Sequence, residues 1–89
     1  MRRAARKDAN ERQIINALIE AGCSVYQIGK PVDLAVGRAG ATFLLECKDG
    51  SKPPSARKLT LAQVTFQNTW KGHLAVVTSP EEALKAVGL

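Results

Sequence analysis

One short segment near the middle of the chain constrains the fold more than any other. Residues 43–48 read Phe-Leu-Leu-Glu-Cys-Lys, an apolar run without Pro or Gly that ends in a carboxylate and an ammonium group. Runs of this length and composition are typical of β-strands. Because side chains alternate between the two faces of a strand, Glu46 and Lys48 share one face. Phe43, Leu45 and Cys47 point the other way, into a core. The segment predicts a core strand with a polar site at its end.

A second short strand, residues 32–36, precedes this one, and a link bracketed by glycines, residues 37–40, joins the two. Such a link predicts a hairpin turn. If the loop is even in length and centred on the middle of this link, Asp33 pairs with Leu44 and lies diagonal to Glu46 on the same face. Diagonal cross-strand positions are roughly 7–8 Å apart, which lets two acidic side chains hold one cation. An odd loop length would break this parity and require a bulge.

The chain as a whole is expected to form one domain over residues 1–89, with a basic arm at residues 1–7. Its 89 residues and two cysteines leave self-association as the expected aid to stability, because no disulfide framework is possible. We expect reduced thiols in a cytoplasmic protein, since no signal peptide or membrane span is recognisable. The net charge of +5 indicates a polyanionic partner, although a basic domain without such a partner would carry the same charge.

Periodicity and turn signals predict an α-β-β-β-α-β-α order, an α/β fold around a mixed sheet. Either Asp8 or Asn10 is a credible N-cap for the first helix. In the second helix, Leu61 and Val64 are expected to face the core. The expected elements are a helix from residue 8 or 10 to about 21, strands over 23–28, 32–36 and 43–48, a helix over 60–71, a strand over 74–78 and a helix from 80 to the glycine at 88.

Helical spacing brings two further polar residues toward the central strand. Glu11 precedes Ile15 by four residues and Leu18 by seven, which places it on the inward stripe of the first helix. It either complements the helix dipole or directs a carboxylate toward the acidic strand face. Gln63 follows Thr60 by three residues, the spacing of a capping box, and the same face of the helix could also approach the site.

These groups suit metal-assisted phosphodiester chemistry. Asp33, Glu46 and Glu11 offer the hard oxygen ligands that Mg²⁺ or Mn²⁺ prefers, and such an ion lowers the pKa of a bound water. Lys48 could orient that water and offset charge on the phosphate. The alternative is a salt-bridge cluster on a solvated sheet face, which an isolated Glu-x-Lys pattern would favour. Phosphates would be held by the basic residues Arg2, Arg3, Lys52, Arg57 and Lys58.

The order Asp33, hairpin, Glu46-Cys47-Lys48 resembles the PD-(D/E)xK nuclease superfamily, and more particularly the virus-type replication-repair nuclease (VRR-Nuc) domain. The resemblance extends from about residue 10 to residue 78 and includes Glu11 and the segments 29–34 and 58–63. It implies a restriction-endonuclease-like α-β-β-β-α-β core with a mixed sheet, followed here by a C-terminal helix. One departure is that the family usually has Pro directly before the Asp, whereas Val32 stands there in this chain.

The resemblance also implies roles for individual residues. Asp33 and Glu46 would bind the metal, assisted by the main-chain carbonyl of Cys47. Lys48 would be catalytic. Glu11, as a further metal ligand, and Gln63 would complete the site.

For function, the resemblance implies a Mg²⁺- or Mn²⁺-dependent, structure-specific DNA endonuclease of phage or prophage type that acts on branched DNA, including four-way (Holliday) junctions. A homodimer is expected, because resolving a junction needs two opposed cuts and each chain carries one site. Two alternatives remain open: a non-catalytic DNA-binding module of the same fold, and a nuclease that acts on linear DNA or RNA.

Overall fold

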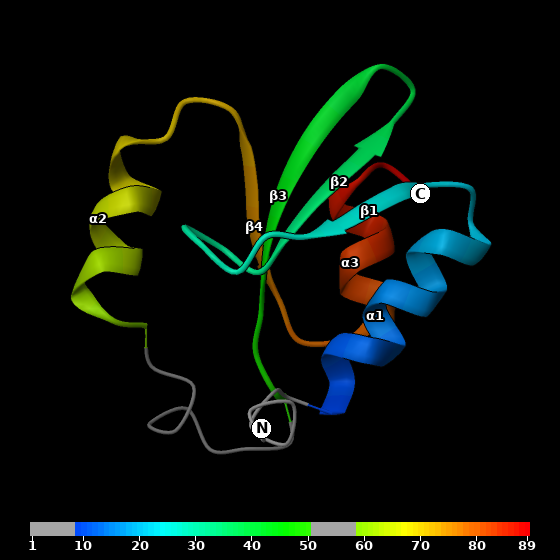
Figure 1. Ribbon diagram of the computed structural model, residues 1–89, viewed down its shortest axis with the longest axis horizontal. Coiled ribbons are helices and arrows are strands. Elements are labelled where there is room, and N and C mark those ends of the chain that lie inside the picture. The colour runs from blue at the N-terminus through cyan, green and yellow to red at the C-terminus, as the bar shows by residue number, and fades with distance from the viewer. Residues whose placement is uncertain (1–8, 51–58) are drawn as a thin grey trace.

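The computed structural model describes residues 9–50 and 59–89. Its elements follow the expected order and confirm an α/β fold (Figure 1). Boundaries differ from the sequence-based ones by at most two residues; β2, for example, begins two residues later than expected. The elements are α1 (Ala9–Glu20), β1 (Ser24–Gln27), β2 (Leu34–Arg38), β3 (Ala41–Cys47), α2 (Leu61–Thr69), β4 (His73–Val77) and α3 (Pro80–Ala86).

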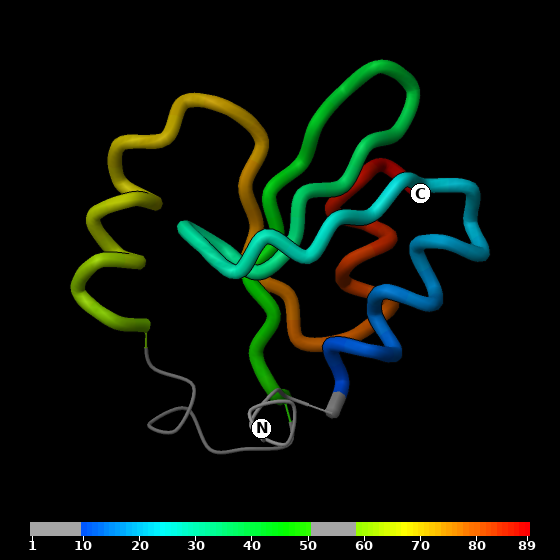
Figure 2. Tube along the Cα trace, in the orientation of Figure 1, coloured from blue at the N-terminus to red at the C-terminus, as the bar shows by residue number. Residues whose placement is uncertain are grey.

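The four strands form one mixed sheet in the order β1-β2-β3-β4. β2 runs antiparallel to both β1 and β3, and β4 runs parallel to β3. Helices α1 and α3 cover one face of the sheet, and α2 lies on the other side (Figures 1 and 2). The carboxyl ends of β3 and β4 therefore lie side by side at the sheet end away from the β2–β3 hairpin.

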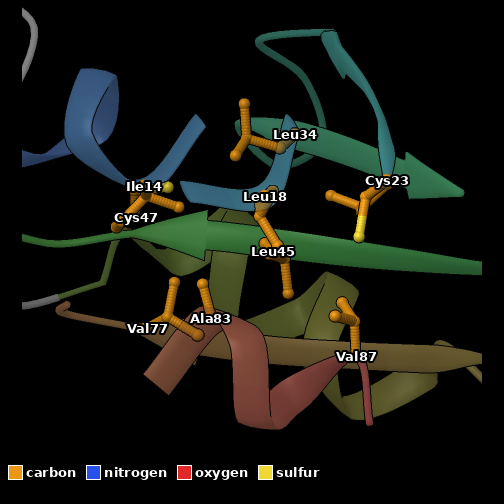
Figure 3. Packing of buried hydrophobic residues seen from close by; sticks show 10 residues of the cluster. Ile14, Leu18, Cys23, Leu34, Leu45, Cys47, Val77, Ala83 and Val87 are labelled. Carbon is orange, nitrogen blue, oxygen red and sulfur yellow. The ribbon is translucent and has the colours of Figure 1, made fainter. Parts of the chain in front are cut away.

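The hydrophobic core fills the space between the sheet and the pair α1 and α3 (Figure 3). Ile14 and Leu18, four residues apart on α1, are fully buried there. Leu45 and Cys47 alternate with Glu46 along β3 and point into the same core, as the strand periodicity predicts. Glu46 consequently points to the opposite face of the sheet, toward α2.

The hairpin has the expected parity but a different register. The turn consists of Ala39 and Gly40 alone, both with positive φ (53° and 82°), which is the signature of a two-residue type I′ turn. The preceding two residues of the link belong to β2, and Leu34 pairs with Leu45. Continuing this register places Asp33 directly opposite Glu46, whereas the sequence analysis placed it opposite Leu44.

One expectation for the second half of the chain, a core-facing side of α2, is wrong. No side chain of α2 is buried, and Leu61 is 82% exposed. The reason is that Gln63 faces the sheet, and a residue two positions away lies about 200° around a helix of 3.6 residues per turn. β4 pairs in parallel with β3, one of the two positions that its apolar sequence favours, and it forms an edge of the sheet.

Within the part of the chain that the structure describes, no helix combines the length and apolar character that a membrane crossing requires.

The turn geometry predicts a stabilising substitution. Ala39 holds a left-handed conformation that Asn adopts more readily, so we expect Ala39→Asn to raise the free energy of unfolding by about 0.5–1 kcal/mol. Gly40→Ala, at the adjacent positive φ, should lower it by a similar amount. Urea unfolding of both variants measures the two changes, and a destabilised Ala39→Asn protein would contradict the turn assignment.

Candidate metal and catalytic site

The sequence-predicted acidic pair meets at the end of β3. Asp33 immediately precedes β2 and lies across from Glu46 on β3. Its Oδ2 accepts a hydrogen bond of 2.8 Å from the backbone N–H of Cys47, which fixes the carboxylate against the strand. The charge of Asp33 also acts on the Glu46 carboxyl, so the two groups share one electrostatic environment.

Glu46 is the most constrained charged residue in this site. It is only 4% exposed, and burial raises the pKa of its carboxyl above the usual 4.5. The negative charge of Asp33 raises that pKa further, whereas Lys48 and Gln63 lower it. Lys48 Nζ lies 3.3 Å from Glu46 Oε2, and Gln63 Nε2 donates to the same oxygen at 2.6 Å. Burial and Asp33 therefore favour the protonated carboxyl of Glu46, whereas Lys48 and Gln63 favour its carboxylate.

The other oxygen of Glu46 has a different environment. Oε1 is buried and has no hydrogen-bond partner among the residues that the structure describes. Buried carboxylate oxygens are normally paired, and an unpaired one is typical of a position where a ligand or ion binds.

Gln63 joins α2 to this site through a single side chain. Its Oε1 accepts a hydrogen bond from the backbone N–H of Thr60. The backbone N–H of Gln63 donates to the Thr60 hydroxyl, which completes the expected capping box. Its Nε2 is then directed at Glu46. The capping role and the approach to the site, both considered from the sequence, are thus compatible in one residue.

Glu11 is buried on α1 and contacts β1. It is 5% exposed in the first turn of α1, and its Oε2 accepts a 3.3 Å hydrogen bond from Gln27 on β1. Residues 9–50 and 59–89 contain no group of three or more His, Cys, Asp or Glu side chains arranged to hold a metal ion. The expected three-carboxylate cluster is therefore not formed here, and the role of Glu11 as a ligand stays a prediction.

The remaining pair nevertheless fits a hard divalent cation. Mg²⁺ keeps several waters and is commonly bound through one or two carboxylates. Asp33 and Glu46 supply these, and the unpaired Glu46 Oε1 supplies an open donor. In a strand the N–H and C=O of one residue point to the same neighbour, so the Cys47 carbonyl is directed to the side on which Asp33 accepts from its N–H.

Sequence reasoning missed one residue at this end of the sheet. Asn10 was considered an N-cap, but it is the second residue of α1, and its side chain donates to the carbonyls of Lys48 and Thr78. No periodicity could reveal this, because the contacts span 38 and 68 residues. The other possible cap, Asp8, lies outside the described residues. So do the expected phosphate-binding residues Arg2, Arg3, Lys52, Arg57 and Lys58.

No protein-family model, curated protein or solved structure matches this chain. The resemblance to VRR-Nuc domains stays a prediction, and functional inference depends on the chain's own residues.

The raised pKa of Glu46 predicts a pH dependence of stability. The folded protein holds this proton more tightly than the unfolded chain, so the contribution of Glu46 is fully present below pH 4.5 and is lost as the pH rises through the raised value. We expect the free energy of unfolding of the wild type, minus that of Glu46→Gln, to fall as the pH rises above 4.5. Urea unfolding on both sides of pH 4.5 measures the difference.

The matched control is Glu20→Gln, which removes an exposed carboxylate at the far end of α1 and should show a much smaller change. A wild-type protein that gains stability over Glu46→Gln as the pH rises would contradict the assignment.

Proposed function

We propose that the protein is a Mg²⁺- or Mn²⁺-dependent, structure-specific DNA endonuclease that hydrolyses phosphodiester bonds in branched DNA such as four-way junctions. One observation carries the proposal: the charge of Asp33 acts on the Glu46 carboxyl at the end of β3, and Lys48 Nζ lies 3.3 Å from Glu46 Oε2. Two carboxylates and an amine on one face of a strand end are the groups that metal-assisted phosphodiester hydrolysis uses.

The carboxylates of Asp33 and Glu46 would hold the ion, together with the main-chain carbonyl of Cys47. The bound ion would supply Lewis-acid stabilisation of phosphate charge and a more acidic water. Asp33 is preorganised for this task by its hydrogen bond from the Cys47 N–H. Glu46 is held through Oε2, which leaves the unpaired Oε1 for the ion.

Lys48 would act on the attacking water and on the phosphate. Its side chain is 19% exposed, so the amine is neither fully solvated nor sealed from a substrate. From its position beside Glu46 it can orient a water by hydrogen bonding and place positive charge near the phosphate oxygens, where charge develops during hydrolysis. Gln63 would keep Glu46 in the rotamer that this arrangement requires.

DNA would be the substrate because the chain is basic, with a net charge of +5 and basic residues before α1 and after β3. Phosphate contacts supply most of the affinity of such proteins, and they carry no sequence information. Preference for branched over linear DNA is the part of the proposal that rests on the resemblance to phage-type VRR-Nuc domains.

Two substitutions test the catalytic assignment. Glu46→Gln removes the charge that would bind the ion, and Lys48→Ala removes the amine. We expect each to lower the cleavage rate of a labelled four-way junction with Mn²⁺ by at least about 100-fold, while most DNA binding is retained. Gel-based cleavage and fluorescence anisotropy measure the two quantities separately, with EDTA as the metal-free reference.

The matched controls are Glu20→Gln and Lys85→Ala, which make the same charge changes at exposed positions of α1 and α3 on the other face of the sheet. Both should cut normally. The proposal would be wrong if the wild-type protein bound junctions but cut no junction, flap or linear substrate. The protein would then be a DNA-binding module. Full activity of either site variant would refute the assigned roles.

The proposed function includes a homodimer. Each chain contributes one Asp33–Glu46 pair, whereas resolution of a four-way junction requires two cuts on opposed strands, which a two-fold dimer would place symmetrically. We expect light scattering to give twice the chain mass at the concentrations at which junctions are cut. A monomer that still makes paired cuts would rule this arrangement out.

A further inference from the structure

We propose that Asn10 is a positioning residue of the nuclease site, which fixes the backbone of Lys48 and thereby the place of its amine. This inference rests on the proposed function and assigns a role to a residue of α1 that lies outside the metal-binding and catalytic set.

The first observation is a bridge made by one nitrogen atom. Asn10 Nδ2 donates to the carbonyl of Lys48 at 2.7 Å and to the carbonyl of Thr78 at 3.0 Å. These two residues directly follow β3 and β4, the parallel pair whose last partners are Cys47 and Val77. One side chain from the start of α1 thus joins the two strands just beyond the end of their ladder.

The second observation is that this bridge completes the restraint of Lys48. The Lys48 N–H donates to the Val77 carbonyl at 2.9 Å, and its carbonyl accepts from Asn10. Both backbone polar groups of Lys48 are therefore held, one by β4 and one by α1. With its backbone fixed on both sides, the side chain reaches Glu46 Oε2 from a defined origin.

The third observation concerns the part of Asn10 that makes no bond. Its Oδ1 is buried and has no hydrogen-bond partner among the described residues. An unpaired buried acceptor is unfavourable for folding, so the amide is poorly explained as a stability device alone. Its two N–H donors are the useful feature, because an isosteric Asp would direct oxygens at the two carbonyls instead.

Loss of the bridge would affect catalysis because the reaction rate depends steeply on the position of the reacting groups. Displacing a reacting group by about 1 Å can reduce a rate by about 100-fold. Without the bridge, Lys48 keeps its N–H bond to the Val77 carbonyl at the end of the ladder, but its own carbonyl loses the bond from Asn10. We therefore expect Asn10→Ala and Asn10→Asp to reduce the single-turnover cleavage rate by about 10- to 100-fold, with little change in the Kd for junction DNA.

Asn10→Ala is the decisive variant, because it removes both donors and the unpaired acceptor together. In Asn10→Asp the favourable effect of an acidic residue in the first turn of a helix is opposed by repulsion between the new carboxylate and the two carbonyl oxygens. The matched control is Arg38→Met. Arg38 Nη1 also donates to a distant backbone carbonyl, that of Val87 at 3.0 Å, but at the hairpin end of the sheet. Single-turnover rates, Kd values and urea unfolding are measured for all three variants, well below their unfolding temperatures.

The inference is supported if both Asn10 variants stay folded, bind DNA as the wild type does and cut slowly, whereas Arg38→Met cuts at the wild-type rate. Wild-type cleavage rates in Asn10→Asp or Asn10→Ala would overturn it and leave the nuclease function standing. Failure of both Asn10 variants to fold, or equal slowing in Arg38→Met, would make the contact structural and also overturn it. A wild-type protein without cleavage would overturn the nuclease function and this inference together.

Discussion

The structure depends at one point on a carboxylate that is almost fully removed from water. Glu46 occupies a strand position whose neighbours on either side, Leu45 and Cys47, are core residues. A buried charge is tolerated only when it is paired and hydrogen-bonded, and Lys48 and Gln63 supply this to a single oxygen. Asp33, placed opposite by the hairpin register, works against it by raising the Glu46 pKa. Two acids are thus held together despite their repulsion, the arrangement a cation would relieve.

The same carboxylate explains how α2 is related to the rest of the fold. None of its side chains is buried, so apolar packing contributes little to its position. Gln63 instead fixes the start of the helix by capping it and ties that start to Glu46. The helix terminus and the site therefore depend on one amide. A change in the charge of Glu46 would be felt at the helix cap, since both bonds share the Gln63 side chain.

Local patterns in the sequence were sufficient to predict most of the elements and part of the site. Alternation along β3 correctly separated Glu46 from the core residues, and the Thr60 to Gln63 spacing correctly predicted a capping box. The predicted register of the β2–β3 hairpin was wrong because the link contains two glycines, and either could belong to the turn. Only the backbone conformation shows that Ala39 and Gly40 form it. The outward face of α2 was missed because its apolar residues suggested a core contact, whereas a polar contact orients the helix. The contacts of Asn10 could not be predicted from local patterns, because its partners, Lys48 and Thr78, are distant in the sequence.

Exceptions to ordinary folding rules gather at one end of the sheet. Glu46 is a charged residue in a core strand. The Asn10 side chain donates to two distant carbonyls while its own oxygen has no hydrogen-bond partner among the described residues. Both lie where β3 and β4 end. Among the described residues, the other buried polar atom without a partner is Gln67 Nε2, one turn after Gln63 on α2. Natural proteins depart from local consistency mainly where function requires it. The concentration of these departures around Lys48, rather than any one contact, is the strongest physical argument that this strand end is the working part of the molecule.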